Sequence, residues 1–549
     1  MERWNAMIAA DRSRWYREQG LWTDDTILSY FSRNVERTPE KVAIVDCRKD
    51  GGRQSISYAA LDEARRSWAA RFVSLGVGRG DVVSFQLPNW WEFAGIYLAC
   101  ETIGAVANPL MPIFRELELE AMLGLAGSRV LIIPTEFRNF KYEPMAATLK
   151  ERLPALAHVL TVEQLRQDLE VRSSDCVSLA SAADDVVELL YTSGTTGVPK
   201  GVMHTGNTLL SALRPFIATL QLTDGDVVFM GSPLGHQTGF LYGMVLPLIL
   251  GGKAIFQDVW DARRAIDIME ADRVTFTMAS TPFLTDLANP ELTHGRDISA
   301  FRTFICGGAA IPRELVQRGG ELLGARILSI WGMTECGIVT LVRPDDPPEL
   351  AFTTDGAPLP SYDVRVIGDG MPASASVQGE LQIRGPSCAV GYLERSDLFP
   401  LDAEAWFSSG DLGSMDAQGY VRISGRSKDI IIRGGENVPV VEVEMALLKH
   451  PAVRDVALVA MPDKRLGERG CAFVVASDAG FTIDEMRTHL NTIGMAKDYW
   501  PEHVELVPEL PRTPSGKVQK FLLRQWAENV TPTLRQAQGL TKMVQRRQD

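Results

Sequence analysis

Apolar and polar positions alternate in a way that predicts short strands, turns and helices over the N-terminal part of the chain. Residues 82–87 are apolar and end at a Pro-Asn turn, and apolar residues recur at helical spacing through 90–107. A strand, a turn and a helix that reaches Ala107 are therefore expected. The same order is expected to begin at 130–133, 186–191, 227–230, 275–278 and 301–306. Repeated strand–helix units indicate a layered α/β domain.

The pattern changes towards the C-terminus. Residues 381–383 and 420–423, with glycine-rich neighbours, predict antiparallel strands that close the first domain. Beyond Arg426, helical patterns at 441–448 and 485–493 alternate with strands at 456–459 and 472–476. The expected fold class is α/β: a large N-terminal layered α/β domain with a β-rich subdomain, and a small, mobile C-terminal α+β domain. The expected boundaries are 1–426 for the N-terminal domain, 427–429 for a hinge, 430–526 for the C-terminal domain and 527–549 for a polar tail.

Length, charge and cysteine usage narrow the class of protein. A chain of 549 residues is too long for one core, and its formal charge of −13 disfavours nucleic acid and anionic membranes as general partners. The longest apolar stretch, 239–252, contains Pro247 and is shorter than the roughly 20 residues that span a bilayer. No apolar segment of the signal-peptide kind occurs in 1–17, and none of the seven cysteines stands in a Cys-x-x-Cys pair. We therefore expect a cytoplasmic protein without a membrane span or a nucleic-acid partner.

A loop rich in glycine and hydroxyl groups follows the strand expected at 186–191. From Tyr191 to Lys200 it reads Tyr-Thr-Ser-Gly-Thr-Thr-Gly-Val-Pro-Lys. Glycines let backbone amides turn inward, and the hydroxyls and the lysine add donors and positive charge, a combination that suits phosphate. The spacing excludes the P-loop, because Pro199 stands where that motif needs glycine. The loop predicts ATP binding, although by itself it leaves an ordinary surface turn open.

Four further motifs follow this loop in order. They are Trp331-Gly332-Met333-Thr334-Glu335, Ser409-Gly410-Asp411, Gly425-Arg426-Ser427-Lys428-Asp429 and Pro511-Arg512-Thr513-Pro514-Ser515-Gly516-Lys517. Together the five segments resemble those of the adenylate-forming superfamily of acyl-CoA synthetases, luciferases and peptide-synthetase adenylation domains. The resemblance spans about residues 26–524 and is closest to ligases for short- or medium-chain fatty acids and for cyclohexanecarboxylate. It implies an AMP-forming acid–thiol ligase with ATP, Mg²⁺ and coenzyme A as cofactors.

The resemblance also implies an ATP site. Trp331 would stack on adenine, although an aromatic residue beside a strand end usually packs in a core. Thr334 would bind the α-phosphate, Glu335 would hold Mg²⁺, and Asp411 would accept the ribose hydroxyls with Arg426 nearby. The implied ATP-binding residues are Thr192, Ser193, Gly194, Thr195, Thr196, Gly197, Lys200, Gly308, Ala309, Trp331, Gly332, Asp411 and Arg426.

The resemblance assigns catalysis to three residues, Lys517, Thr334 and Glu335. The ammonium of Lys517 would meet the negative charge that develops between the carboxylate and the α-phosphate. Lys428 would be the hinge about which the small domain rotates for the second step. Gly434 and Gly435 would then leave space for the pantetheine arm of coenzyme A. A lysine acetyltransferase and a deacetylase acting on Lys517 are expected as regulatory partners.

The acyl pocket is expected at His236, Gly307 and Gly332. Amino-acid-activating relatives have an aspartate where this chain has Gly235, so an uncharged apolar acid is the expected substrate. Short- or medium-chain fatty acids and alicyclic acids such as cyclohexanecarboxylate all remain open, because one methylene changes discrimination by only about 1 to 3 kcal/mol. Three alternatives also stay open: transfer to a carrier-protein phosphopantetheine, a luciferase-like oxygenase, and a non-enzymatic nucleotide sensor. The sensor would tolerate loss of Lys517, Glu335 or Asp411, yet all three are present.

Overall fold

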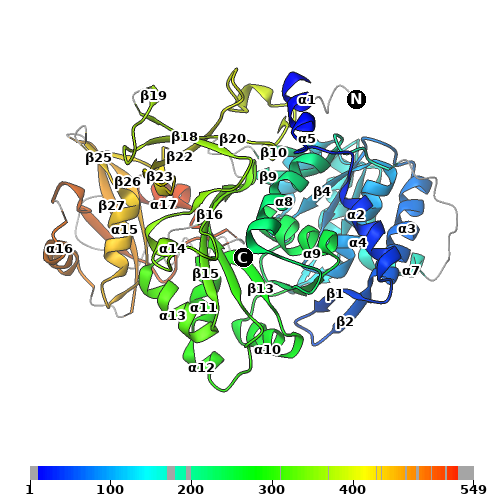
Figure 1. Ribbon diagram of the computed structural model, residues 1–549, viewed down its shortest axis with the longest axis horizontal. Coiled ribbons are helices and arrows are strands. Elements are labelled where there is room, and N and C mark those ends of the chain that lie inside the picture. Colours follow the sequence, from blue (N-terminus) through cyan, green and yellow to red (C-terminus); the bar gives the residue numbers. More distant parts are fainter. Residues whose placement is uncertain are drawn as a thin grey trace. The chain divides into compact units, whose positions relative to one another are not determined.

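The structure is a computed structural model (Figure 1). It describes residues 10–169, 180–192, 199–308, 311–368, 370–427, 429–433, 436–463, 466–477, 481–495, 497–513 and 516–528. The chain divides into two compact units. The first comprises 1–365, 382–409 and 415–422, and the second comprises 366–381, 410–414 and 423–549. Within the described ranges, no helix is both long and apolar enough to cross a membrane.

The first unit contains a nine-stranded sheet. From β15 to β1 its neighbouring strands run parallel, and antiparallel strands complete both ends. The buried strands are continuous apolar runs because both faces of a parallel sheet are covered. In spatial order the strands are β17 (Ala357–Pro358), β16 (Gly337–Leu341), β15 (Arg326–Met333), β14 (Thr303–Gly307), β13 (Phe276–Ser280), β11 (Val227–Met230), β12 (Lys253–Gln257), β1 (Val42–Cys47) and β2 (Arg53–Ser57).

A seven-stranded sheet accompanies it in the same unit. Its order is β21 (Gly391–Tyr392), β10 (Lys200–Thr205), β9 (Val186–Thr192), β4 (Val106–Leu110), β3 (Val82–Gln86), β5 (Val130–Ile133) and β8 (His158–Thr161). Strands β9 and β10 pair antiparallel, with Thr192 opposite Lys200 and Glu188 opposite His204. Residues that face each other in an antiparallel pair project from the same side of the sheet. The ends of the loop 193–198 are therefore fixed by a strand pair.

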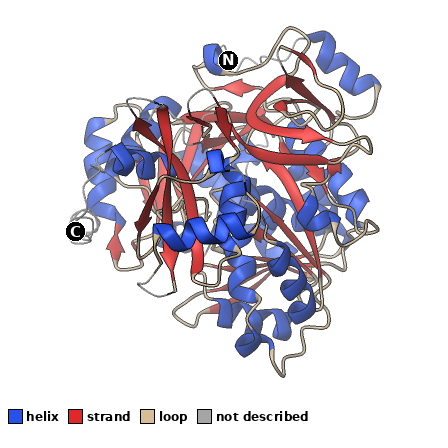
Figure 2. Ribbon diagram, turned by 90° about the vertical axis from the view of Figure 1, so that its left-hand side faces the viewer, coloured by secondary structure: helices blue, strands red, loops and turns tan. Residues whose placement is uncertain are grey.

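Helices alternate with these strands along the chain. Figure 2 draws the helices in blue and the strands in red. Every residue of α4 is buried, and the helix ends at Gly104 with φ +70°, a left-handed conformation that glycine adopts without strain. The helices are α1 (Ala10–Glu18), α2 (Ile27–Arg37), α3 (Tyr58–Ser74), α4 (Trp91–Ile103), α5 (Glu116–Ala126), α6 (Tyr142–Arg152), α7 (Val162–Asp168), α8 (Gly206–Leu220), the π-helix η2 (Thr238–Val245), α9 (Leu246–Leu250), α10 (Ala262–Asp272), α11 (Thr281–Leu287), α12 (Pro290–Thr293), α13 (Arg313–Leu323) and α14 (Leu350–Thr353).

Two local expectations were wrong. The helix expected through Ala107 ends at Ile103, and residues from Val106 form β4 instead. Because 105–107 are as apolar as the helix before them, periodicity does not reveal the change, whereas Gly104 does. The segment after β9 is not a helix either: the chain returns as β10 before α8 begins. The expected α/β fold class is confirmed.

A smaller sheet has the order β19 (Met371–Pro372), β18 (Asp363–Gly368), β20 (Gly379–Arg384), β22 (Phe407–Met415) and β23 (Val421–Arg426). Two short strands, β6 (Glu136–Phe137) and β7 (Phe140–Lys141), form a separate hairpin. Its turn residues Arg138 and Asn139 both have positive φ. That backbone is typical of a tight two-residue turn.

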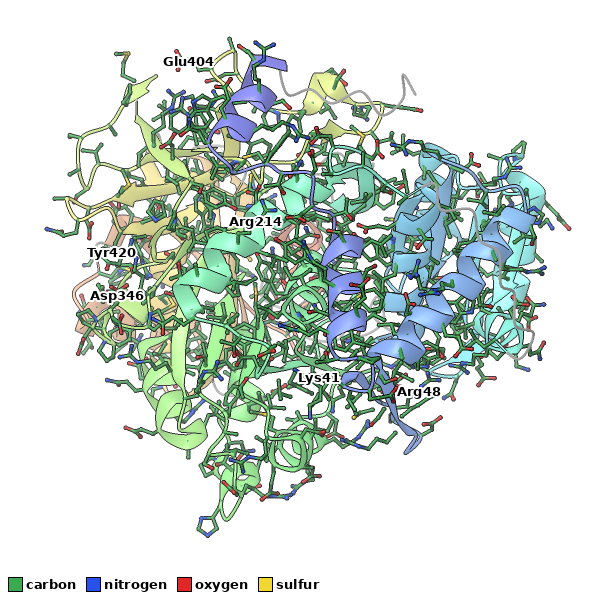
Figure 3. The ribbon with its side chains drawn as sticks, turned by 45° about the vertical axis from the view of Figure 1, so that its right-hand side comes forward. Lys41, Arg48, Arg214, Asp346, Glu404 and Tyr420 are labelled. Carbon is green, nitrogen blue, oxygen red and sulfur yellow. The ribbon has the colours of Figure 1, made fainter. Side chains whose placement is uncertain are left out.

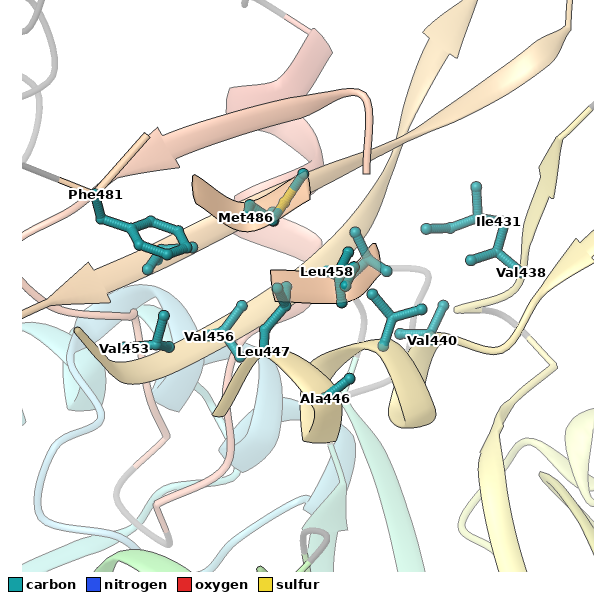
Figure 4. Close-up of a cluster of buried hydrophobic side chains, with 14 residues drawn as sticks. Ile431, Val438, Val440, Ala446, Leu447, Val453, Val456, Leu458, Phe481 and Met486 are labelled. Carbon is teal, nitrogen blue, oxygen red and sulfur yellow. The ribbon is translucent and has the colours of Figure 1, made fainter. Parts of the chain in front are cut away.

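The second unit contains its own sheet, in the order β25 (Glu436–Val438), β24 (Ile431–Arg433), β27 (Gly467–Ala476) and β26 (Val453–Asp463), with β28 (His503–Leu506) parallel to β27. Alternate residues of β26 enter different cores: Val456 and Leu458 pack with α15 (Val440–Leu448) and α16 (Ile483–Thr492). Figure 4 shows Leu447 of α15 beside Val456 and Leu458 in this cluster. Ala457 and Val459 pack instead with α17 (Lys520–Glu528). The period of two in β26 therefore builds a helix-covered sheet.

Candidate active site

The turn that carries Thr334 and Glu335 joins β15 to β16 in the first unit. The amide of Cys336 donates to the Met333 carbonyl at 3.2 Å and closes this turn. Both Thr334 and Glu335 are partly exposed, whereas Cys336 is fully buried. The two predicted phosphate- and metal-binding side chains are thus accessible and stand on an anchored backbone.

Glu335 and Lys200 meet at one aromatic side chain. The hydroxyl of Tyr392 donates to Oε1 of Glu335 at 2.8 Å. The ammonium of Lys200 lies over the Tyr392 ring, with Nζ 4.8 Å from its centroid, where the ring attracts a cation. Tyr392 is only 4% exposed and therefore offers a fixed reference for both groups. The structure brings together two residues that the sequence could assign only separately.

Glycines around Trp331 are required by space. A Cβ on Gly332 would lie 2.3 Å from the carbonyl oxygen of Gly337, and one on Gly307 would lie 2.4 Å from Cδ1 of Ile330. Gly308 is exposed and has φ +84°. Trp331 is buried, and its amide donates to Oγ1 of Thr340 at 3.2 Å. Stacking of Trp331 on adenine stays a prediction.

The predicted acyl side is built on η2. His236 is partly buried just before this π-helix, and its Nδ1 accepts the amide of Thr238 at 3.3 Å. π-helices are often found at functional sites. Phe240, Leu241 and Met244 of η2 are fully buried, so the helix is apolar on the inside.

A buried polar pair includes the residue just before that helix. Glu188 of β9 is fully buried, and Gln237 beside His236 is 4% exposed. Burial raises the pKa of Glu188 well above its ordinary value, and the amide of Gln237 opposes this only in part. Burial therefore favours the neutral form of this carboxyl group. Neither residue was identified from the sequence, because a carboxylate in an apolar strand carries no spacing signal.

Asp411 and Arg426 both belong to the second unit and bind each other. Nε of Arg426 donates to Oδ1 of Asp411 at 2.7 Å. Asp411 is 7% exposed, while the Arg426 side chain is 60% exposed. The sequence predicted that both would serve the ribose and did not predict their direct ion pair. Their role at a nucleotide stays a prediction.

Lys517 lies at the end of a closed loop in the same unit. The amide of Thr513 donates to the Lys517 carbonyl at 2.7 Å, and the amide of Lys517 donates to Oγ1 of Thr513 at 3.1 Å. Arg512 adds a hydrogen bond from Nη1 to the Gly516 carbonyl at 2.6 Å. The side chain of Lys517 is exposed on this braced loop. Its catalytic role stays a prediction.

Several predicted residues lie outside the described residues. They are Ser193, Gly194, Thr195, Thr196 and Gly197 of the loop, Ala309, the expected hinge residue Lys428, and Gly434 and Gly435 of the expected coenzyme A channel. The ends of the loop, Thr192 and Lys200, are described and pair across β9 and β10.

A single carboxylate at the turn fits Mg²⁺ bound largely by phosphate. Among the described side chains, no group of three or more His, Cys, Asp or Glu could hold a metal ion by itself. Mg²⁺ is commonly bound by one or two carboxylates together with substrate phosphates and water. Glu335 is the predicted residue that offers such an oxygen beside Lys200.

Two contacts at the site were missed in the sequence, those of Tyr392 and His204. The imidazole of His204 is buried, with Nε2 2.8 Å from the Thr334 carbonyl oxygen. Burial lowers the pKa of His204 to about 4. Because 130 residues separate the two partners, no local pattern could reveal the bond.

Comparison with known proteins places this geometry in a family. Residues 31–393 match the AMP-binding enzyme family, and residues 442–517 match the AMP-binding enzyme C-terminal domain. A medium-chain fatty-acid–CoA ligase of Escherichia coli (strain K12) is 39% identical over 523 residues, 93% of this chain and 92% of that protein. A 2,3-dihydroxybenzoate-AMP ligase of Bacillus subtilis (strain 168) is 30% identical over 518 residues, 93% of this chain and 95% of that protein.

The solved structures agree with this result. ATP-bound MatB from Rhodopseudomonas palustris matches with a TM-score of 0.82 and 28% identity, over 92% of this chain and 99% of that one. ATP, Mg²⁺ and coenzyme A are the cofactors of AMP-forming acyl-CoA ligases, and the predicted superfamily and enzyme class are confirmed. The chain is an adenylate-forming ligase and belongs to the AMP-binding enzyme family.

Proposed function

We propose that the protein activates an apolar carboxylic acid, either a short- or medium-chain fatty acid or an alicyclic acid such as cyclohexanecarboxylate. The acid would react with ATP to give an acyl-adenylate and pyrophosphate, and then with coenzyme A to give the thioester and AMP. The 39% identity to a medium-chain fatty-acid–CoA ligase over nearly the whole chain supports this choice.

The observation that carries the proposal is the close packing at Gly235. A Cβ there would lie 3.1 Å from both the Leu110 carbonyl carbon and the Met111 nitrogen. An aspartate, which would pair with the ammonium of an amino acid, does not fit unless that backbone moves. A buried ammonium without a partner costs several kcal/mol. Together with the apolar interior of η2, this packing favours an uncharged acyl group.

The proposed roles follow from charge. As a carboxylate oxygen attacks the α-phosphorus, negative charge grows on the phosphate oxygens and must be met by fixed donors. Lys200 offers a cation, the Thr334 hydroxyl offers a donor, and Glu335 offers an oxygen ligand for Mg²⁺, which would neutralise phosphate charge. Lys517 would supply its ammonium at the bridging oxygen. Lys200 and Glu335 already share Tyr392, which favours their acting on one substrate.

A second candidate is an aryl-acid ligase, with coenzyme A or a carrier protein as acceptor. The 30% identity to a 2,3-dihydroxybenzoate-AMP ligase favours it, because that protein is covered over 95% of its length. A luciferase-like oxygenase would need oxygen and emit light. These alternatives differ in the acid, the acceptor and the need for oxygen, and all three differences can be measured.

The deciding experiment is pyrophosphate release over a panel of acids, with and without coenzyme A. The panel should contain butyrate, hexanoate, octanoate, cyclohexanecarboxylate, 2,3-dihydroxybenzoate, salicylate and several amino acids. Highest activity with an apolar aliphatic or alicyclic acid, together with the matching acyl-CoA, is the expected result. Preference for an aryl acid would support the aryl-acid ligase, and oxygen uptake would support the luciferase-like oxygenase.

Two substitutions test the division of labour in this reaction. Lys517→Ala should lower adenylation by more than about 100-fold, because one well-aimed donor to a developing oxyanion is worth that much. Transfer to coenzyme A from supplied acyl-adenylate should survive. Lys428→Pro should have the reverse effect, because proline fixes φ and removes the freedom that a hinge needs. Equal loss of both half-reactions in either variant would contradict its assigned role.

Acetylation of Lys517 would switch adenylation off by removing the ammonium charge. The exposure of this side chain supports its access to a modifying enzyme. Treatment with a lysine acetyltransferase and acetyl-CoA, followed by peptide mapping and a deacetylase, tests the idea. Modification at Lys517 with unchanged adenylation would refute it.

A further inference from the structure

His204 bonds to the turn that carries Thr334 and Glu335. Its ring is 1% exposed, with Nε2 2.8 Å from the Thr334 carbonyl oxygen and Nδ1 3.0 Å from Oγ1 of Thr208. It lies on β10, the strand that begins at Lys200. One side chain therefore connects the strand after the glycine-rich loop to the predicted phosphate-binding turn.

The partners of the ring decide which nitrogen carries the proton. A carbonyl oxygen can only accept, so Nε2 must donate its hydrogen to Thr334. Burial keeps the ring neutral by lowering the pKa of His204 to about 4. A neutral imidazole has one N–H, and Nδ1 therefore accepts from the hydroxyl of Thr208. The hydroxyl and the carbonyl together fix the tautomer.

Three successive carbonyls of the turn are held from outside it. Thr334 accepts from His204, and Glu335 accepts the amide of Ala389 at 2.6 Å. The Cys336 carbonyl accepts the hydroxyls of Ser387 at 2.8 Å and Tyr362 at 3.1 Å. The Glu335 and Cys336 carbonyls thus accept from residues in the range 362–389, whereas the Thr334 carbonyl accepts from His204 on β10. The turn is thus aligned from two sides.

A buried histidine with two good hydrogen bonds is often a structural residue. Two features point beyond that role. The carbonyl that His204 holds belongs to the residue predicted to bind the α-phosphate, and the next residue is the predicted Mg²⁺ ligand. A backbone rotation at Thr334 would move the Thr334 hydroxyl and the Glu335 carboxylate together. Displacement of reacting groups by about 1 Å can cost on the order of 100-fold in rate.

We propose, on the basis of the function proposed above, that His204 is a positioning residue for adenylation. Its Nε2–H holds the Thr334 carbonyl, and this bond keeps the Thr334 hydroxyl and the Glu335 carboxylate directed at the phosphates of ATP and at Mg²⁺. Thr208 secures the required tautomer. The bond matters more for adenylation than for the second step, because only adenylation involves pyrophosphate departure and its metal ion, whereas the α-phosphate that Thr334 would bind is present in both steps.

The test compares two substitutions that differ in one donor. His204→Leu fills apolar space and leaves the Thr334 carbonyl without its donor, whereas His204→Gln keeps an N–H that can reach it. His158 provides the matched control, because its Nε2 also lies 3.1 Å from a backbone carbonyl, that of Leu75, but on β8. His158→Leu therefore reports the general cost of losing such a bond.

Three quantities are measured on folded, full-length protein: ATP–pyrophosphate exchange, the Mg²⁺ dependence of that exchange, and thioester formation from supplied acyl-adenylate. His204→Leu should lower kcat for exchange by about 10- to 100-fold and raise the Mg²⁺ requirement, with the KM for the acid unchanged, as for other groups that orient a metal ligand. His204→Gln should recover most of the exchange. Thioester formation from supplied acyl-adenylate should fall less than exchange in His204→Leu, and His158→Leu should not alter the Mg²⁺ dependence.

Specific outcomes would overturn the proposal. Equal loss of both half-reactions in His204→Leu, or equal activity of the leucine and glutamine variants, would leave only a structural role. The same conclusion would follow if His158→Leu shifted the Mg²⁺ dependence as strongly as His204→Leu does. If His204→Leu does not fold, the test rests on His204→Gln. A His204→Gln protein of normal stability that still loses exchange by 10-fold or more would contradict the proposal, because its amide should replace the lost donor. Absence of exchange in the unsubstituted protein with every acid would instead refute the proposed function.

Discussion

Tyr392 connects Lys200 and Glu335 through two separable parts of one side chain. Its hydroxyl bonds to Glu335 at 2.8 Å, and its ring faces the ammonium of Lys200. Tyr392→Phe removes the first contact and keeps the second. We expect a roughly 10-fold fall in adenylation and a higher Mg²⁺ requirement, because the orienting hydrogen bond of the proposed metal ligand is lost. Pyrophosphate exchange as a function of Mg²⁺ concentration measures both effects.

Tyr420 offers the control for this substitution. Its hydroxyl donates to Oδ1 of Asp346 at 2.8 Å, again a tyrosine–carboxylate bond within the first unit, and Figure 3 labels both residues. Tyr420→Phe should leave the Mg²⁺ dependence unchanged. A shift of similar size in both phenylalanine variants would show that Tyr392 acts through general stability.

The close packing at Gly235 leads to a prediction about substrate specificity. Gly235→Asp introduces the carboxylate found in amino-acid-activating relatives, but its Cβ would press on the Leu110–Met111 backbone at 3.1 Å. We expect lower activity with the best apolar acid and no exchange with any amino acid, because the backbone must move before an ammonium could be bound. Strong exchange with an amino acid would show that the pocket adapts easily.

At the scale of elements, the hairpin of β15 and β16 depends on a close backbone contact. Gly332→Ala would place a Cβ 2.3 Å from the Gly337 carbonyl oxygen and 2.9 Å from Cα of Ile338. Both neighbours are backbone atoms, so the strands must separate and the turn with Glu335 must move. Destabilisation by about 2 kcal/mol or more is expected, in the upper range for single substitutions, together with loss of adenylation.

Gly320→Ala is the matched control, and its expected effect has the opposite sign. Gly320 lies within α13, and its added Cβ would meet the Ala325 carbonyl oxygen at an ordinary 3.5 Å. Alanine in a helix interior is favoured over glycine by about 0.5 to 1 kcal/mol. Chemical denaturation of both variants checks the pair. Two substitutions with the same sign would contradict the packing argument.

The sequence predicted best the elements whose burial alone determines their pattern of apolar residues. β5 and β11 were located to the residue because a buried parallel strand is a short apolar run between turns. β10 was missed because Lys200 and His204 interrupt such a run, although both are explained by what they contact. A helix was expected after β11 and η2 lies there, but its π form was not predicted, since the apolar pattern did not distinguish i→i+5 from i→i+4 hydrogen bonds.

The candidate site also contains residues that the sequence could identify and residues that it could not. Motifs identified Thr334, Glu335 and Lys200 because their spacing along the chain is local. Tyr392 and His204 could not be identified, because each acts through a contact made by folding: 57 residues separate Tyr392 from Glu335, and 130 separate His204 from Thr334. Support for a catalytic side chain therefore requires the tertiary structure, even where the side chain itself is evident from sequence.

At the scale of the whole molecule, stability should depend on pH through a carboxyl group far from the predicted catalytic residues in sequence. Glu101 of α4 is 1% exposed and accepts hydrogen bonds from the Tyr97 hydroxyl at 2.7 Å and from the Leu28 amide at 2.7 Å. Burial nevertheless raises the pKa of Glu101 from 4.5 to about 7. The hydrogen bonds thus offset only part of the desolvation of the charged form.

The direction of the pH effect follows from proton binding. Between about pH 4.5 and 7 the folded protein holds the Glu101 proton more tightly than the unfolded chain, so the free energy of unfolding falls as pH rises. The contribution is fully present below pH 4.5 and lost above pH 7, and a shift of this size corresponds to about 3 kcal/mol. Glu101→Gln should abolish it, since the amide carries no charge, and its oxygen can accept the Leu28 amide while its NH2 group donates to the Tyr97 hydroxyl oxygen. The variant should therefore match the unsubstituted protein near pH 5 and exceed it by up to about 3 kcal/mol near pH 8.

Denaturant unfolding at several pH values, followed by hydrogen exchange in α4, measures this difference. Glu270→Gln serves as the control, because Glu270 is only partly buried and its pKa is lowered from 4.5, so it titrates below this window. The slope between pH 5 and 7 should change in the Glu101 variant and persist in the Glu270 variant. A Glu101→Gln protein that is equally less stable at pH 5 and pH 8 would show that the carboxyl group is needed for its hydrogen bonds. The fold would then tolerate the buried charge, and the pH dependence would have to arise elsewhere.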